Sequence, residues 1–123
     1  MLKFEFMYEY KIKEIVRVVD GDTVDVVIDV GFSLFLKQRV RLRGINCPEL
    51  HRSKSAGVGA GEMARDYAQK WFDQNPKLLI RTYKDDKYGR LLAEIISADT
   101  QQSINQDLIK TGHASPHNGR LKP

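Results

Sequence analysis

The chain has 123 residues, of which 41% are apolar and 29% charged, values that suit one globular domain with a continuous core. Its formal net charge of +4 favours polyanionic partners such as nucleic acid, but only weakly. The single cysteine, Cys47, excludes an intrachain disulfide, the first residues lack the pattern of a secretory signal, and no apolar run is long enough to span a membrane. We therefore expect a cytoplasmic protein, with secretion as the alternative if a signal had been removed. Since no feature demands an oligomer, we expect a monomer.

The first half of the chain has the pattern of β-strands. Residues 8–19 are rich in aromatic and β-branched side chains, and residues 20–22 supply the Asp-Gly-Asp chemistry of a tight turn. Residues 24–30 alternate between apolar and acidic positions, which predicts a half-buried strand. A third strand is predicted over residues 36–43, with apolar side chains on one face and a charged second face formed by Lys37, Arg39, Arg41 and Arg43.

The second half begins with a glycine- and serine-rich loop over residues 50–61 and a predicted helix over residues 62–73. The apolar residues of this helix recur at helical spacing and predict one stripe of core packing: Met63, Ala64, Tyr67, Ala68, Trp71 and Phe72. Strands at 78–83 and 90–97, a short helix at 103–110 and an irregular tail at 113–123 follow. This order predicts an α+β fold, a five-stranded OB-type barrel, within a domain at residues 1–112.

Polar residues that suit phosphodiester hydrolysis stand beside the predicted turns and strand ends. This reaction needs a hard cation with oxygen ligands, a base that activates water, and cationic donors for the phosphoryl oxygens. Asp22 lies at the first turn, Arg41 in the third strand, Glu49 just after that strand, and Arg90 at the start of the fifth. The chain therefore offers all three types of group.

Three segments resemble the staphylococcal nuclease (thermonuclease) family. They are Val-Asp-Gly-Asp-Thr-Val at 19–24, Val-Arg-Leu-Arg-Gly-Ile-Asn-Cys-Pro-Glu at 40–49, and Asp-Lys-Tyr-Gly-Arg at 86–90, in the family's order and spacing. The resemblance covers most of the chain, from about residue 10 to residue 112. It implies the SNase-like OB-fold and a calcium-dependent endonuclease that cleaves single-stranded or unpaired DNA and RNA with little sequence selectivity.

The resemblance implies a metal site for Ca²⁺ or another divalent cation. Asp22 would supply a carboxylate, Asn46 a side-chain oxygen, and Cys47 its main-chain carbonyl. Asn46 stands where the family typically has an aspartate. An amide oxygen can bind calcium but brings no negative charge, so we expect weaker metal binding or a changed preference among divalent ions.

The resemblance also assigns the groups that meet the substrate. Glu49 would be the general base, and Arg41 and Arg90 would hold the scissile phosphate. Lys87 and Tyr88 would contact a second phosphate.

Simpler interpretations compete with each assignment. An Asp-Gly-Asp sequence is common turn chemistry, and Arg41, Glu49 and Arg90 would each be ordinary as solvated charges. A zinc site formed by Cys47, His51, His113 and His117 is disfavoured, because the spacing is not a standard pattern and Pro116 interrupts the second pair.

A second hypothesis is an inactive module of the same fold that binds nucleic acid or protein. Asn46 favours this reading, since it removes an expected charge. The joint retention of Asp22, Arg41, Glu49 and Arg90 favours the enzyme. The tail after Gly112 departs from the family's pattern, and substrate contacts from that region are not carried over.

Overall fold

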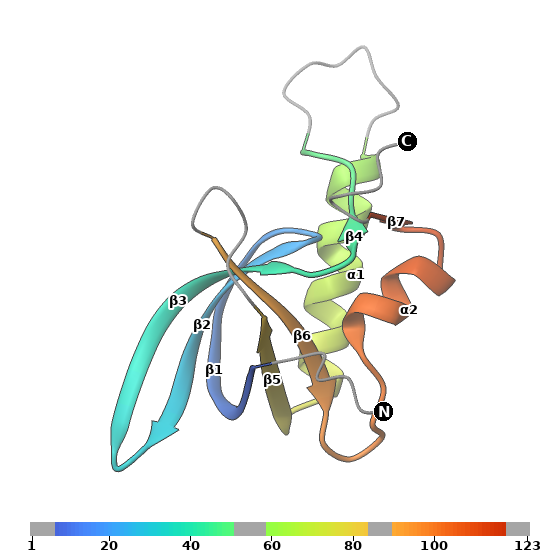
Figure 1. Ribbon diagram of the computed structural model, residues 1–123. Helices are drawn as coiled ribbons and strands as arrows, with labels where there is room; N and C mark the ends of the chain where they lie inside the picture. Colours follow the sequence, from blue (N-terminus) through green and yellow to red (C-terminus); the bar gives the residue numbers. More distant parts are fainter. Residues whose placement is uncertain (1–6, 51–58, 84–89, 118–123) are drawn as a thin grey trace, which may run out of the picture.

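The computed structural model describes residues 7–50, 59–83 and 90–117. Five strands close into a barrel in the order β1-β2-β3-β6-β5 (Figure 1). Neighbouring strands are antiparallel except β3 and β6, which are parallel. The strands are β1 (Tyr8–Asp20), β2 (Thr23–Gly31), β3 (Leu34–Leu42), β5 (Leu78–Tyr83) and β6 (Leu91–Ser97). The predicted five-stranded OB-type barrel is confirmed.

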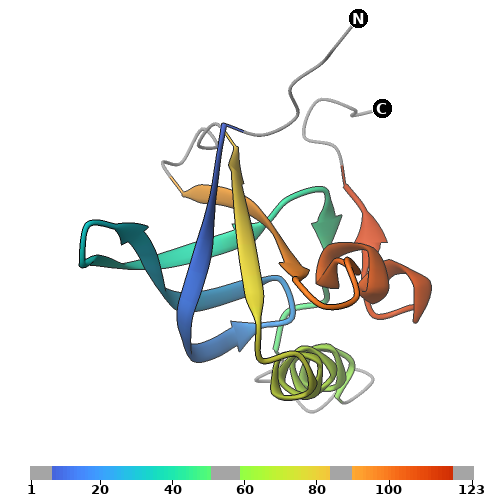
Figure 2. The ribbon, with the colours of Figure 1, turned by 90° about the horizontal axis from the view of Figure 1, so that it is seen from below.

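Alternating side chains fill the barrel. In β2, Val24, Val26 and Ile28 are buried, and in β3 the buried residues are Val40 and Leu42. Their strand neighbours point outward, as the period of two requires. The β2–β3 hairpin extends beyond the barrel wall, on the side away from α2 (Figure 2).

Two helices pack on the barrel, α1 (Ala60–Gln74) and α2 (Ile104–Lys110). The predicted apolar stripe of α1 lies in or against the core, apart from Met63, whose side chain is 60% exposed. Trp71 joins the helices, because its indole Nε1–H donates to Asp107 in α2 at 2.9 Å. The N-terminus of α2 is capped by Ser103, whose hydroxyl accepts from the main-chain N–H of Gln106.

A buried amide fixes α2 where β3 and β6 end their parallel pairing. The side-chain nitrogen of Asn105 donates to the main-chain oxygens of Arg43 and Ala93, at 2.9 and 3.1 Å. Its side-chain oxygen accepts from the N–H of Ile95 at 3.2 Å. Asn105 therefore satisfies three polar groups of the separating strands, which would otherwise be costly to bury.

A small second sheet follows the barrel. Strand β4 (Ile45–Asn46) pairs antiparallel with β7 (Ser115–Pro116), within the tail that we expected to be irregular. A two-residue strand containing proline has no sequence pattern, so it could not be predicted. Among the described residues, neither helix has the length and apolar character needed to cross a membrane.

Candidate active site

Asp22 is held in the turn between β1 and β2. Its carboxylate accepts a hydrogen bond from the Thr23 hydroxyl at 3.1 Å and another from the main-chain N–H of Cys47 at 2.9 Å. Its own carbonyl accepts from the N–H of Leu42 at 2.8 Å. Asp22 is only 7% exposed, far less than a plain turn residue would be. The turn is therefore fastened to the segment that follows β3.

Close packing holds this turn against α1. A Cβ atom at Gly21 would lie 2.8 Å from the Cβ of Ala64 and 2.9 Å from the Sγ of Cys47. Only glycine fits at this approach. The same small contact therefore places Asp20 and Asp22 beside both the helix and Cys47.

Arg41 joins Asp22 to Asn46. Its Nη1 donates to the main-chain oxygens of Leu42 and Ile45, both at 3.0 Å, and lies 3.4 Å from the Asp22 carboxylate. Its Nη2 donates to the side-chain oxygen of Asn46 at 3.1 Å. Arg41, a predicted phosphate ligand, is thus ion-paired with one predicted metal ligand, Asp22, and hydrogen-bonded to another, Asn46.

Cys47 contributes its main chain rather than its thiol. Burial raises the pKa of this thiol to about 12, with a further increase from the Asp22 carboxylate that outweighs the opposing effect of Arg41. The thiol is therefore protonated at neutral pH and is neither a nucleophile nor a ready metal ligand.

Glu49 is exposed, and its main chain crosses the first turn of α1 at Gly61. A Cβ at position 61 would collide with the carbonyl group of Glu49 and lie 2.8 Å from the main-chain nitrogen of Leu50. Gly61 therefore sets the path of the chain at Glu49. The sequence did not indicate a role for Gly61, because it was assigned to the glycine-rich loop that precedes the predicted helix.

Asp20 lies near both Asp22 and Glu49. Burial raises the pKa of the Asp20 carboxyl, and the carboxylates of Asp22 and Glu49 raise it further, against weaker opposing effects of Arg65 and Arg39. Asp20 is therefore close enough to Asp22 and to Glu49 to be repelled by each of them. Asp20 had been interpreted only as turn chemistry, and its adjacency to Asp22 was the signal that could have identified it.

Arg90 lies one residue before β6 and is exposed. Leu92 is paired with Arg41 across the parallel β3–β6 ladder. Arg90 lies two residues before Leu92 and thus close along the chain to the strand position paired with Arg41. Lys87 and Tyr88 lie outside the described residues.

The predicted ligands do not form a ready cluster of acidic, histidine or cysteine side chains. No group of three or more such side chains able to hold a metal occurs within residues 7–50, 59–83 and 90–117. A cation here would depend on Asp22 together with amide and main-chain oxygens. Of the residues weighed for zinc, His113 instead packs its ring on Tyr67 at a centroid distance of 4.9 Å, and His51 is outside the described residues.

The tail lies beside the predicted metal ligands. Ser115 pairs with Asn46 between β7 and β4, and its hydroxyl donates to the Asn46 carbonyl at 3.5 Å. The N–H of His117 donates to the carbonyl of Gly44 at 2.8 Å. The residues around Ser115 therefore belong to the surroundings of the site, which the sequence did not indicate.

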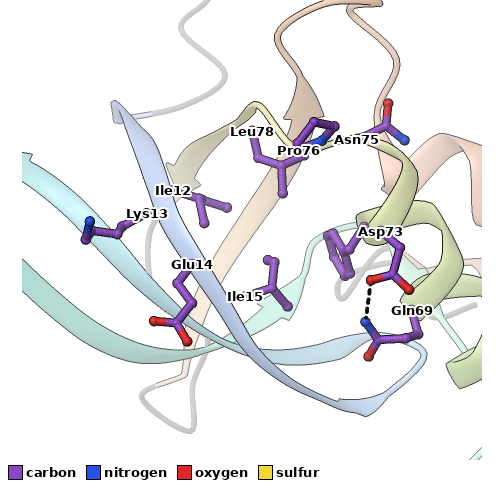
Figure 3. A pocket seen from close by; sticks show the side chains of 10 residues that line it. Ile12, Lys13, Glu14, Ile15, Gln69, Asp73, Asn75, Pro76 and Leu78 are labelled. Atoms are coloured by element: carbon purple, nitrogen blue, oxygen red, sulfur yellow. Dashed lines mark hydrogen bonds between the residues drawn. The ribbon is translucent and has the colours of Figure 1, made fainter.

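A separate cleft of about 210 Å³ lies between β1 and the C-terminal half of α1 (Figure 3). Lys13 and Glu14 line one side, and Gln69 donates to Asp73 at 3.1 Å on the other. None of the predicted site residues lines this cleft. The candidate active site is instead the largely buried group around Arg41 and Asp22.

A family model described as staphylococcal nuclease homologue matches residues 39–122, more than half of the chain. The chain is a staphylococcal nuclease homologue. The matched residues of this homologue include Arg41, Glu49 and Arg90, and the match begins after Asp22. The homologue is also 29% identical, over 128 aligned positions, to the uncharacterized protein MJ1439 of Methanocaldococcus jannaschii. That alignment covers 87% of the present chain but 59% of the relative, so the chain spans about three fifths of the relative's length.

Proposed function

We propose that this chain is a divalent-metal-dependent nuclease that hydrolyses phosphodiester bonds of DNA or RNA, preferring single-stranded or unpaired substrates. The observation that carries the proposal is that Arg41 forms an ion pair with Asp22 and a hydrogen bond with Asn46. Membership of the staphylococcal nuclease homologue family supports the same reaction class.

Each protein group has a distinct task in this proposal. Glu49, which is exposed to solvent and lies near Asp20, would orient a water molecule and accept its proton as the water attacks phosphorus. Arg41 and Arg90 would donate to the non-bridging phosphoryl oxygens as negative charge grows on them. Their planar guanidinium groups suit two oxygens at once.

The donor set suits a hard divalent cation. Asp22 and Asn46 would supply side-chain oxygens and Cys47 its main-chain carbonyl, and calcium favours such mixed oxygen donors. Burial raises the pKa of Asp20, and the carboxylates of Asp22 and Glu49 raise it further; a cation bound at Asp22 would offset their negative charge. When bound, the metal would supply positive charge to the substrate phosphate.

The test is cleavage of labelled single-stranded DNA and RNA in calcium, in magnesium and in chelator. We expect cutting that requires a divalent cation and stops in chelator. Glu49→Gln should lower the rate by about 10²- to 10⁴-fold, the range of a lost general base. Glu9→Gln, at the start of β1, is the matched control and should cut like wild type.

Binding of nucleic acid without cutting, in every metal tried, would contradict the nuclease proposal. It would favour the alternative of a catalytically inactive binding module, for which Asn46 is the supporting observation. Full activity in Glu49→Gln would remove Glu49 from its assigned role.

A further inference from the structure

One face of β3 carries an alternating row of side chains that leads away from the candidate active site. The row begins at Arg41 and continues outward along every second residue to Arg39, Lys37 and Phe35. The opposite face of the strand is buried at Val40 and Leu42, which fixes the orientation of the row. From Arg41 to Phe35 the strand advances six residues, or about 20 Å.

The far end of this row exposes aromatic rings. Phe35 is 50% exposed, and Phe32 in the hairpin turn is 94% exposed with a backbone φ of 57°. A phenylalanine in the left-handed region is unfavourable, and full exposure of its ring adds nothing to the core. The Nζ of Lys13 lies 5.2 Å from the centre of the Phe35 ring. Cations next to exposed aromatic rings are the combination used in sequence-tolerant binding of single strands.

The charge of this face complements a phosphate backbone. Asp25 accepts two hydrogen bonds from Arg39, at 2.8 and 3.1 Å, and Arg17 pairs with Asp25 in the ladder between β1 and β2. Lys37 and Arg17 also lie close enough to help lower the pKa of the Asp25 carboxyl, after the hydrogen bond from Arg39. Three cations therefore surround one carboxylate.

The remaining charges on the outer face balance one another. Lys11 of β1 pairs with Asp29 of β2. Glu14 of β1 and Lys37 of β3 both pair with the same residue of β2, Val27. With Lys13 beside Phe35, the outer face of the first three strands holds five cations against four carboxylates, not counting Arg41 and Asp20 in the site itself. One of the four carboxylates, Glu9, is bound by Arg81 of β5. A second copy of the chain would bring the same positive face, so charge favours a polyanion.

We propose that the outer face of β3, from Arg41 to Phe35, is a binding track for single-stranded nucleic acid. Nucleotides on one side of the scissile phosphate would run along it, with their phosphates near Arg39 and Lys37 and a base stacked on Phe35. The proposal rests on the proposed nuclease function for the position of the scissile phosphate.

The test measures binding rather than cutting, in chelator, by fluorescence anisotropy of labelled single-stranded DNA of about 4 and about 16 nucleotides, the range of OB-fold site sizes. Lys37→Gln should weaken binding of the long strand about 3- to 10-fold and reduce the slope of log affinity against log salt by about 0.7. Phe35→Ala should weaken it by roughly tenfold, the effect of one lost stacking contact. Lys110→Gln, on α2, is the matched control and should bind like wild type.

We expect wild type to bind the long strand more tightly than the short one, and we expect both variants to lose this difference in affinity. Long-strand binding unchanged in both hairpin variants, or no binding of the long strand by wild type, would overturn the track. If wild type is a dimer in light scattering and Phe35→Ala separates it, a second copy occupies this face and the track is again overturned.

The outcomes separate this proposal from the nuclease itself. Length-dependent binding that requires Lys37, without any cutting, would support the track and contradict the nuclease. Cutting that depends on Glu49, with binding unaffected by Lys37→Gln and Phe35→Ala, would support the nuclease and contradict the track. Thermal unfolding of each variant, compared with wild type, shows whether the exposed substitutions leave the fold intact.

Discussion

Arg41 is oriented mainly by neutral acceptors. Two of its N–H groups bind the main-chain oxygens of Leu42 and Ile45, and a third binds the Asn46 amide. A guanidinium has five N–H groups, so two remain, on Nε and Nη2, without a hydrogen bond to the described residues. These carbonyl acceptors fix the side chain without neutralising its charge, and the one carboxylate beside it among the described residues, Asp22, is 3.4 Å from Nη1. Arg41 is thereby pre-positioned to meet an anion, as transition-state stabilisation requires.

Asp20 gives a pH-dependent prediction. Its folded pKa is raised above the usual value of 3.8, first by burial and then by Asp22 and Glu49. The ionised form is therefore disfavoured in the folded protein, and stability is lost as pH rises through the folded pKa. Asp20→Asn should increase the free energy of unfolding at pH 7 by up to about 1 kcal/mol, the scale of a partly screened charge interaction.

Urea denaturation without metal, at pH values from 7 down to 3.5, measures this effect. The advantage of the variant should shrink as Asp20 becomes protonated and be nearly gone near its usual pKa of 3.8. A constant difference across this range, or a less stable variant at pH 7, would show that charge repulsion at Asp20 is not the cause.

Individual site residues could be predicted only where a motif surrounds them. The Asp-Gly-Asp turn and the Arg41–Glu49 segment supplied Asp22, Arg41 and Asn46, which the structure does bring together. Asp20 and Gly61 could not be found in this way. Their importance comes from the packing of α1 against the turn and against Glu49, which depends on tertiary contacts.

At the scale of elements, the spacing of apolar residues was sufficient to predict a helix or strand wherever one of its faces is buried. The alternation in β2, the bounds of β5 at Leu78–Tyr83 and the apolar stripe of α1 all follow from it. The sequence pattern did not predict the exposure of Met63 or the existence of β7. Met63 fits the helical stripe but lies at its exposed margin, and β7 is too short to have a period.

Gly61 tests how α1 supports the site. Alanine is normally favoured over glycine inside a helix by roughly 0.5–1 kcal/mol. At position 61, however, its Cβ would meet the carbonyl group of Glu49. Gly61→Ala should therefore destabilise the protein by about 1–3 kcal/mol, the usual effect of overpacking.

The same variant should displace Glu49. We expect kcat to fall about tenfold or more with a smaller change in KM, since misplacement of a catalytic group affects the chemical step. Met63→Ala, on the exposed side of the same helix, is the control. A more stable Gly61→Ala enzyme with wild-type kcat would remove Gly61 as a positioning residue.

At the scale of the whole molecule, metal binding should couple to unfolding. A cation that binds only the folded chain adds about 2.7 kcal/mol at 100 times its dissociation constant. Asn46→Asp supplies a charged oxygen beside Asp22, so it should bind calcium more tightly. A tenfold gain would add about 1.4 kcal/mol, or about 4 °C in Tm.

Thermal unfolding with calcium and with chelator, for wild type and Asn46→Asp, measures the coupling. The comparison uses the calcium-induced shift of each protein, because the substitution also changes the contact with Arg41. Equal shifts would remove position 46 from the metal ligands, and no shift in either protein would contradict calcium binding.

The pairing of β4 with β7 has a consequence for the order in which the protein is assembled. Asn46 and Ser115 are neighbours in space but 69 positions apart in the chain. During synthesis the N-terminal part emerges first, so β4 leaves the ribosome long before its partner strand exists. A nascent chain that has not yet reached Ser115 therefore lacks the β7 contact to Asn46, and this edge of the candidate site forms only after β7 has been made.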